Sequence, residues 1–516
     1  MLLPLLGGPS LAYVVTLASF EGDRMSAASA ASKLFIPPYP PRPARPRGSL
    51  SLLLALQRSP IEVWWAGDFE RPVSIGRTIF GLRAAAHDPA AVRRVFLDNS
   101  ANYRKDDLQL RILRPGLGNG LLTAEGEDWR VQRRALAPLF SPRQTAEFAP
   151  AVHRVGQAAI ERMMRRRDGA VADVGAVMSR LTLEVLEQTL FSQGIGRDPS
   201  AFQRAVSSYF ETIGRIDPLD LLGAPAFVPR LRRRRGRGAL EFFDSAVNAI
   251  IEKRQALLSG GGEAPRDLLT LLLSAKDPEN GRGIADADVR ANIVTFINAG
   301  HETTANALTW TLFLLSQSPE WRERAEADAD QAFGSEGAVA TEKCEILRAV
   351  FEEALRLYPP AAMLARQAIA DDELAGIRIP AGTVVTVSPY VLHRRRGLWD
   401  HPDAFDPSRF LNERRDRIDR FAYIPFGAGP RVCIGMAFAM QEGIILLAHL
   451  LRSFRFDLVE GHVVMPVQRV TLRPRGGLKM HVKRREFHRG KILCESALTE
   501  ISQGPICASP NDDGRF

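Results

Sequence analysis

The chain has 516 residues, of which 45% are hydrophobic and 25% are charged, and its formal net charge is +9. These fractions are typical of a folded globular protein and exclude a chain that is largely disordered or fibrous. The four cysteines are too few for a disulfide framework and lack the CxxC spacing of a structural zinc site, which favours a reducing, cytoplasmic location.

Part of the positive charge lies in two arginine runs, Arg165–Arg167 and Arg232–Arg235. Such runs occur in proteins that bind nucleic acids or anionic membranes, but no zinc finger, recognition helix or base-stacking motif accompanies them. We interpret them as solvated surface and expect no nucleic-acid partner. In an electron-transfer protein, a positive patch has another use, which is to attract an acidic redox partner.

The two ends of the chain are expected to lie outside the catalytic domain. Residues 1–20 carry no charge, but glycine and proline interrupt them and no basic residue precedes them. We therefore favour a leader, or an over-extended start before Met25, over a membrane anchor. If these residues did act as an anchor, they would bring the protein into contact with a membrane. The segment 37–46 (PPYPPRPARP) predicts an extended, polyproline-type lead-in rather than core. We expect a leader and lead-in at 1–48, a catalytic domain at 49–485 and a poorly ordered tail at 486–516.

Helical periodicity dominates from residue 49 to about residue 370, and three helices of the chain matter for function. The first, at 286–318, is apolar on most faces, can be capped by Asp286 or Asp288 and is stopped by a proline, so it is expected to be buried. The second, at 346–358, ends at two prolines. The third, at 435–454, is nearly all apolar and is also expected in the core.

Between the second and third helices the apolar period changes from 3.6 to 2. Residues 377–387 predict a β-hairpin around a Pro-Ala-Gly turn. Residues 393–421 are rich in Arg, Asp and Pro without a regular period, which is typical of a functional or specially pinned loop. The expected fold class is therefore mainly α with a small β region.

The strongest pattern is the glycine-rich segment 426–435 (FGAGPRVCIG), directly before the third helix. A cysteine sulfur that binds iron must be ionised, shielded from water and held by backbone N–H groups. The glycines let the backbone curl close to the sulfur and to a flat macrocycle, and the helix N-terminus favours negative charge. Arg431 is placed to meet a carboxylate. The alternative, a merely buried structural cysteine, is weak because these residue types rarely coincide at these offsets by chance.

The second pattern is Ala299–Thr304 (AGHETT), in the middle of the long helix. A glutamate and two threonines are costly there unless they serve a function. The Ala-Gly pair leaves room beside the backbone, and a threonine hydroxyl can displace a helix hydrogen bond and widen the turn. This predicts a pocket for dioxygen and water in which Glu302 and Thr303 supply protons. On its own, the pattern also fits threonines bonded back to their helix and a glutamate at solvent.

The third pattern is the pair Glu353 and Arg356, which share one face of the second helix. In an apolar helix such charges must be fully paired, which invites a further partner. Arg409, in the irregular loop, is the natural candidate. Its expected role is structural, because it would hold the loop under the cysteine in place.

Together these segments resemble the cytochrome P450 family, over residues 50–485 and with all motifs in that family's order. The resemblance implies that haem b lies between the long central helix and the helix after the cysteine loop. It also implies that Cys433 is the axial thiolate ligand of the iron, and that Glu302 and Thr303 are the acid–alcohol pair that delivers protons. The family's salt-bridge triad corresponds to Glu353, Arg356 and Arg409.

The resemblance extends to other residues that would hold the haem. Trp129 and Arg133 match a Trp-x-x-x-Arg pattern whose side chains contact a propionate, and Arg366 stands where the family often has another propionate partner. The haem-binding residues that it implies in the cysteine loop are Phe426, Gly429, Arg431, Cys433 and Gly435.

Two departures from the family pattern occur. Ser408 stands where the family commonly has Glu, a tolerable change because Arg409 makes the key contact. The tail after Arg485 has no counterpart in the family, so Cys494 and Cys507 inherit no role.

By this resemblance the chain is a monooxygenase that inserts one oxygen atom of O2 into an apolar organic substrate, by hydroxylation or epoxidation. Its pocket is expected to include Phe296, Ala299, residues 361–364 and part of 109–122. No flavin- or nicotinamide-binding segment is found, so electrons are expected from a separate ferredoxin or flavoprotein that docks on the basic face near Cys433.

Three alternatives remain open at this point. A peroxide-driven or isomerising haem-thiolate enzyme needs no proton relay, so the Glu302–Thr303 pair argues against it. A haem-based gas sensor needs a signalling module, which the sequence does not show. A helical protein without a cofactor would have Cys433 merely buried.

Overall fold

The computed structural model describes residues 34–485, apart from 79, 193–204, 206–219, 221–236 and 335–337. Residues 1–33 of the expected leader and lead-in, the expected tail at 486–516 and the arginine run at 232–235 lie outside the described residues. The described elements belong to a unit that begins at Phe35. Among the described residues, none of the helices combines the length and apolar character needed to cross a membrane.

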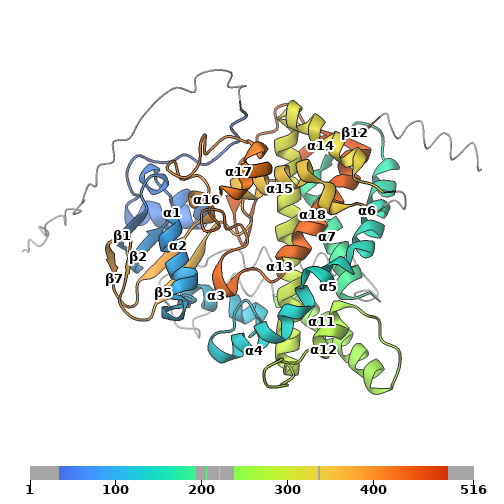
Figure 1. Cartoon of the computed structure of the whole chain (residues 1–516), viewed down its shortest axis with the longest axis horizontal. Coiled ribbons are helices and arrows are strands. Elements are labelled where there is room, and N and C mark those ends of the chain that lie inside the picture. The colour runs from blue at the N-terminus through green and yellow to red at the C-terminus, as the bar shows by residue number, and fades with distance from the viewer. Residues whose placement is uncertain are drawn as a thin grey trace, which may run out of the picture. The chain divides into compact units, whose positions relative to one another are not determined.

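Helices make up most of the described unit (Figure 1). The α-helices are α1 (Ser49–Arg58), α2 (Pro89–Arg93), α3 (Asp107–Leu117), α4 (Gly126–Leu136), α5 (Pro142–Ala146), α6 (Ala149–Met164), α7 (Val174–Leu190), α11 (Arg237–Ser259), α12 (Leu268–Leu273), α13 (Asp286–Ser316), α14 (Pro319–Gln331), α15 (Glu345–Leu357), α16 (Pro389–Leu392), α17 (Asn412–Asp416) and α18 (Met436–Ser453).

The strands of the described residues form four small sheets. The strands are β1 (Val73–Thr78), β2 (Gly81–Ala86), β3 (Tyr103–Arg104), β4 (Ala170–Asp173), β5 (Leu364–Ala368), β6 (Asp372–Leu374), β7 (Ile377–Ile379), β8 (Val384–Val387), β9 (Phe454–Leu458), β10 (Pro466–Gln468), β11 (Leu472–Pro474) and β12 (Lys479–Arg484). The largest sheet has the order β1-β2-β8-β5-β3, and the others are β4-β12-β9, β10-β11 and β6-β7. Within the largest sheet, β2 and β8 are parallel and the other neighbours are antiparallel.

The predicted hairpin over 377–387 is wrong in its pairing. Both strands form, but β7 pairs with β6, whereas β8 pairs with β5 and β2. The tight turn of the real hairpin is at Ala375 and Gly376, which both have positive φ. The Pro380–Gly382 turn instead carries the chain from one sheet to the other, where Gly382 N–H donates to the carbonyl of Ala368.

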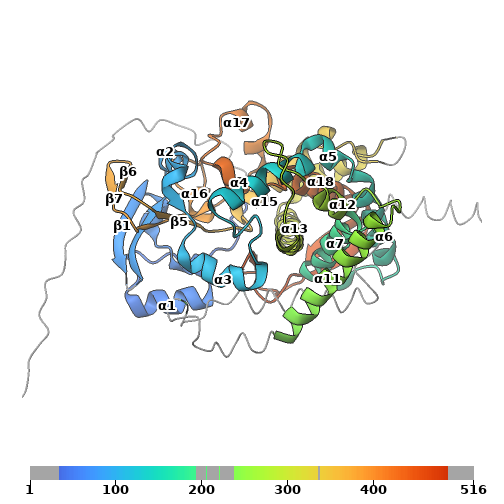
Figure 2. The same cartoon turned by 90° about the horizontal axis from the view of Figure 1, so that it is seen from below.

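Helix α13 passes through the middle of the unit and is seen end-on in Figure 2, with α7, α12 and α18 around it. Its residues are buried along most of its length because apolar side chains cover most of its faces. Asp286 and Asp288 lie in its first turn, where carboxylates favour the helix dipole, but Ala285 is the N-cap. Near its end, Trp310 stacks on Tyr358 with ring centroids 3.8 Å apart, which joins α13 to the end of α15.

The proline-rich lead-in is extended and packs against the core. Pro37 and Pro40 are buried. The Tyr358 hydroxyl donates to the Pro38 carbonyl at 2.7 Å, and Arg42 donates to the Asp403 carboxylate at 2.9 Å. The lead-in is therefore fixed to the irregular loop after α16 as well as to the end of α15.

Candidate active site

The cysteine loop before α18 is closed by its own backbone. The Cys433 N–H donates to the Phe426 carbonyl at 2.9 Å, and the Gly427 N–H donates to the Ile424 carbonyl at 3.0 Å. Gly429 has a φ of +70°, and a Cβ at this position would lie 1.7 Å from the carbonyl oxygen of Phe96. Since no side chain fits there, glycine is required for the loop to pack against the segment after α2.

The Cys433 side chain is accessible to solvent, although protein atoms crowd around it. Burial raises the pKa of its thiol, while a hydrogen bond from the Gly435 N–H and the charge of Arg133 lower it. Gly435 is the N-cap of α18, so the sulfur lies beside a helix N-terminus. The arrangement suits a sulfur that becomes ionised when it binds a metal, because the backbone and one cation already favour the thiolate.

One buried lysine and two half-buried arginines converge near this loop. The Lys105 ammonium donates to the Leu122 carbonyl, and burial together with the charges of Arg431 and Arg366 lowers the pKa of Lys105 to about 7. Burial, with the charge of Arg431, likewise lowers the pKa of Arg366 to about 10. Arg431 forms an ion pair with Glu125 at 3.1 Å. Within the described part of the chain, no carboxylate lies within ion-pair distance of Lys105 or Arg366.

This excess of buried positive charge fits an anionic group such as the two propionates of haem. Trp129 contributes to the same cluster, because the Arg431 guanidinium lies 4.2 Å from the centre of its ring. Arg431 also donates to the Ala124 carbonyl at 3.1 Å. The structure thus brings Trp129, Arg366 and Arg431 together, and it places Arg133 within electrostatic reach of Cys433. Sequence reasoning missed Lys105, since no pattern around it marks it as buried.

The middle of α13 has an accessible strip. Ala299 is exposed and Thr303 half-buried, although the residues on either side of this segment are buried. The two residues are one turn apart and so share a face, and the Thr303 hydroxyl donates to the Ala299 carbonyl at 2.6 Å. Gly300 serves another purpose than expected, because a Cβ there would lie 3.1 Å from Leu186, so it allows close packing against α7.

Glu302, the residue before Thr303, makes its polar contacts with another element. Its carboxylate lies 3.6 Å from the Arg473 guanidinium, on the side of β11. Burial raises the pKa of Glu302, and Arg473 and a hydrogen bond with Thr471 lower it in turn. The structure therefore places the predicted acid and alcohol on neighbouring positions but with different partners. Phe296, expected to line the pocket, is buried and packs edge-on against Phe140 at 5.1 Å.

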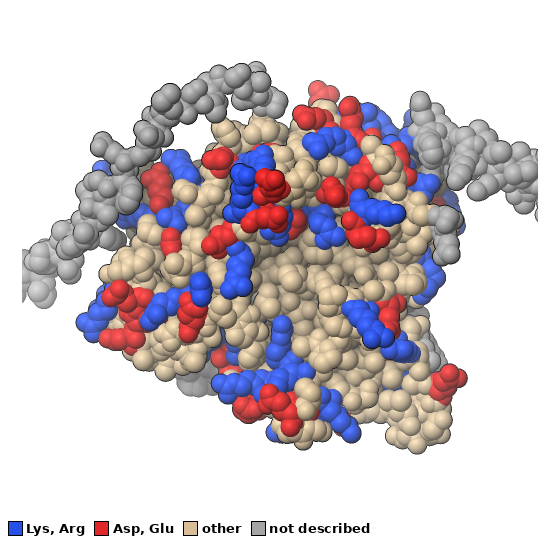
Figure 3. All heavy atoms as spheres, viewed as in Figure 1, with Lys and Arg blue, Asp and Glu red and all other residues tan. Residues whose placement is uncertain are grey.

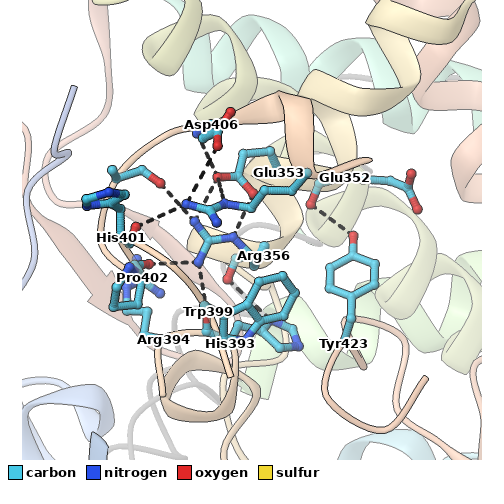
Figure 4. Close-up of polar contacts among 12 residues, drawn as sticks. Glu352, Glu353, Arg356, His393, Arg394, Trp399, His401, Pro402, Asp406 and Tyr423 are labelled. Atoms are coloured by element: carbon cyan, nitrogen blue, oxygen red, sulfur yellow. Dashed lines mark hydrogen bonds and ion pairs between the residues drawn. The ribbon is translucent and has the colours of Figure 1, made fainter. Parts of the chain in front are cut away.

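Glu353 and Arg356 lie together in a network of polar contacts (Figure 4), and Arg409 joins them as a second cation beside Glu353. Arg356 is completely buried, and its five N–H groups all have acceptors. Two donate to the Glu353 carboxylate at 2.6 and 2.7 Å, and three donate to backbone carbonyls of the irregular loop at 2.7 to 2.9 Å. Arg409 lies 3.5 Å from Glu353 and donates to the His401 carbonyl at 3.2 Å.

One further residue, which sequence reasoning missed, joins this network to the cysteine loop. His393 Nε2 accepts from the Ile424 N–H at 2.9 Å, and its Nδ1 lies 3.2 Å from the Arg356 carbonyl oxygen. Because Nε2 is an acceptor, Nδ1 carries the proton and donates to Arg356. Burial and the neighbouring charge of Arg356 hold the pKa of His393 well below its usual value, which keeps the ring neutral.

A surface hollow of about 490 Å3 lies behind the cysteine loop, lined in part by Phe426, Gly427 and the exposed Met436. Arg348, Arg415 and Arg420 also line it. Figure 3 views the face that carries α5 and α17, where an uncharged area is bordered by blue and red side chains. The hollow therefore combines apolar surface next to the cysteine loop with charged groups at its border.

Comparisons with known proteins agree with this geometry. The family model for cytochrome P450 matches residues 83–481. Cyclooctatin synthase from Streptomyces melanosporofaciens is 35% identical over 364 residues, which are 70% of this chain and 77% of that protein. Cytochrome P450 4V2 from Homo sapiens is 30% identical over 413 residues, which are 76% of this chain and 78% of that protein.

A solved structure is also similar. The heme domain of cytochrome P450DA aligns with a TM-score of 0.73 and 25% sequence identity, over 88% of this chain and 99% of that chain. Its fold agrees with the mainly α architecture with small sheets that the sequence predicts. The chain belongs to the cytochrome P450 family, the haem-thiolate oxidoreductases that its cysteine loop resembles.

Proposed function

We propose that the protein is a haem b monooxygenase that inserts one atom of O2 into an apolar substrate, by hydroxylation or epoxidation. The observation that carries the proposal is the Cys433 sulfur, accessible at a helix N-terminus in a loop that its own backbone holds closed. Burial raises the pKa of its thiol, but the Gly435 N–H and the charge of Arg133 oppose that rise, so these two groups would support the thiolate once a metal is bound.

Cys433 would hold the haem iron, and the propionates would meet the cationic cluster of Lys105, Arg366 and Arg431, with Trp129 and Arg133 beside it. Phe426, Gly429 and Gly435 shape the loop around the sulfur. When bound, haem supplies the activation of dioxygen, and a thiolate ligand favours cleavage of the O–O bond. The protein supplies orientation, protons and the exclusion of water.

The protons would come through α13. The Thr303 O–H donates a hydrogen bond to the Ala299 carbonyl, so its oxygen lone pairs remain available to accept a hydrogen bond in the accessible strip. Glu302 is the adjacent acid, and burial raises the pKa of its carboxyl. An acid of this kind favours monooxygenation over a peroxide-driven or isomerising reaction, which needs no proton supply.

The names of relatives support an oxygenation of an organic small molecule. Besides cyclooctatin synthase, they include a cyclooctat-9-en-7-ol 5-monooxygenase of Streptomyces melanosporofaciens and a cytokinin hydroxylase of Arabidopsis thaliana. We propose an apolar substrate because Ala299, the exposed residue of the accessible strip of α13, is apolar.

Electrons would arrive from a separate ferredoxin or flavoprotein that docks at the hollow behind the cysteine loop. The apolar Met436 is exposed there, and arginines of that hollow, Arg348 and Arg420, suit an acidic partner. This site would place the donor against the loop that holds Cys433.

The test uses protein reconstituted with haem. We expect the reduced carbon monoxide complex to show the strongly red-shifted Soret band of thiolate ligation, and labelled O2 to enter a product when a redox partner is supplied. Cys433→Ala should abolish the shifted band. Cys344→Ala is the matched control, because Cys344 is buried with its pKa raised to about 12, chiefly by burial. An unshifted Soret band, or an unchanged spectrum in Cys433→Ala, would contradict the proposal.

A further inference from the structure

Successive side chains on one face of α13 form hydrogen bonds or ion pairs with residues of the segment that begins β11. Glu302, Asn306 and Trp310 are spaced by four and therefore lie on one face of the helix. The Trp310 indole N–H donates to the Leu472 carbonyl at 3.1 Å, and the Asn306 side chain donates to the Thr471 hydroxyl at 3.0 Å. Because Thr471 accepts from Asn306, its own O–H is left to donate, and Glu302 is its partner.

Arg473 completes this series on the next residue of the segment. Its guanidinium lies 3.6 Å from Glu302 Oε1, and its side chain is 37% exposed, whereas that of Glu302 is 10% exposed. The other carboxylate oxygen, Oε2, is buried without a hydrogen-bond partner. Arg473 therefore lies between a buried acid and the surface.

The backbone that carries Arg473 is fixed in place. The Leu472 N–H donates to the Pro360 carbonyl at 3.0 Å, and β11 pairs with β10 so that Leu472 faces Gln468. The Gln468 N–H donates in turn to the Ser59 hydroxyl at 3.0 Å. Because the segment is held from both sides, the distance from Arg473 to Glu302 is set by the fold and not by a free loop.

We propose that Arg473 is a positioning residue for Glu302, holding its carboxylate on the β11 side of α13 and connecting this buried acid to solvent. The inference rests on the proposed monooxygenase function. After Glu302 releases a proton towards Thr303, the Arg473 guanidinium stabilises the carboxylate that remains. A new proton then reaches Glu302 from solvent on the side where Arg473 is exposed. Two side chains from outside α13 shift the pKa of Glu302, namely those of Arg473 and Thr471.

The consequence for pH has a definite sign. Burial raises the pKa of Glu302 and Arg473 lowers it, so the loss of Arg473 must raise it further. A weaker acid delivers protons less readily, and it also stays protonated up to a higher pH. The pH at which proton delivery fails should therefore move upwards, while the maximal rate of delivery falls.

The experiment compares Arg473→Gln with Arg473→Lys, which keeps the charge. The matched control is Arg475→Gln, since Arg475 is two residues further on and pairs at 3.4 Å with Glu62 at the surface. The pKa of Glu302 is read directly by infrared titration, from the carboxyl band that disappears in Glu302→Gln. We expect a rise of about 1 unit in Arg473→Gln and little change in the other two variants. The share of reducing equivalents that appear in product should fall in Arg473→Gln alone.

The two readouts separate the inference from the function on which it rests. An unchanged Glu302 titration in folded Arg473→Gln, in an enzyme that oxygenates its substrate, overturns the inference and leaves the function standing. The same holds if the titration shifts but product coupling stays at the wild-type value. Absence of oxygenation in the wild type overturns the proposed function itself, whatever the infrared titration shows.

Discussion

His393 Nε2 lies 2.9 Å from the backbone nitrogen of Ile424, from which it accepts a hydrogen bond, and the same ring reaches the Arg356 carbonyl through Nδ1. One neutral imidazole thus joins the buried Glu353–Arg356 pair to the start of the cysteine loop. The Glu353–Arg356 pair therefore holds the irregular loop and, through His393, also the residues that precede Cys433.

Replacement of His393 by phenylalanine should destabilise the protein and loosen the cysteine loop. The ring is kept, but the Ile424 N–H and the Arg356 carbonyl lose their partner, and each unpaired buried group costs about 1–3 kcal/mol. Urea unfolding should show this loss, and the Soret band of the reduced carbon monoxide complex should lose intensity at its thiolate position. His481→Phe, at a half-buried strand residue with one ring contact to Gly169 at 3.0 Å, is the control. Equal stability of the two variants would contradict the assignment.

Lys105→Met should have opposite effects on the protein with and without haem. In the ligand-free protein, the pKa of Lys105 is lowered from 10.5 to about 7, chiefly by burial. The unfolded chain binds this proton over that whole range, so folding stability is lost as pH falls from 10.5 to about 7. The substitution removes this penalty and should stabilise the ligand-free protein near neutral pH.

The same substitution should weaken haem binding by about 10-fold or more, since a charge-assisted contact to a propionate is lost. Urea unfolding of the ligand-free protein and the rate of haem transfer to an acceptor protein measure the two effects. Lys253→Met, at an exposed position of α11, should change neither. Tighter or unchanged haem binding in Lys105→Met would show that Lys105 is not part of the propionate site.

Arg420→Glu should slow reduction by an acidic protein partner by about 10-fold at low salt, because the exposed side chain borders the hollow behind the cysteine loop. The difference should shrink as ionic strength rises. Stopped-flow reduction measures it, with dithionite as the small reductant whose rate should not change. Arg77→Glu makes the same charge change at an exposed position of β1. If both variants slow the partner equally, the docking site lies elsewhere.

His449 and His153 should make the fold sensitive to acid. His153 Nδ1 lies 3.1 Å from His449 Nε2, and His153 Nε2 accepts from the Val339 N–H, so His153 Nδ1 carries the proton of its ring and donates to His449 Nε2. Burial, followed by the charges of His153 and Arg452, lowers the pKa of His449 to about 4. The unfolded chain takes up a proton below pH 6.5 and the folded chain does not, so stability falls as pH drops from 6.5 to about 4.

The loss for one such histidine is up to about 1.4 kcal/mol per pH unit within that window. Urea unfolding between about pH 7 and pH 5 should show a shallower fall for His449→Gln than for the wild type. His153→Gln should act in the same direction, because burial lowers the pKa of His153 as well. An unchanged slope in both variants would refute the assignment.

The sequence by itself determined the cysteine loop, the long buried helix and the Glu353–Arg356 pair. Each depends on residues close together in the chain, whose spacing already implies a turn, an apolar helix or a shared helix face. The family follows from the order of these local patterns.

Only the tertiary structure decided which distant residues complete the site. Lys105, His393 and Arg473 carry no local signal, because what matters is the group that each one meets across a long separation in sequence: Arg431, Ile424 and Glu302. The same reason explains the wrong hairpin, since strand propensity is local whereas the choice of a partner strand depends on how the whole chain packs.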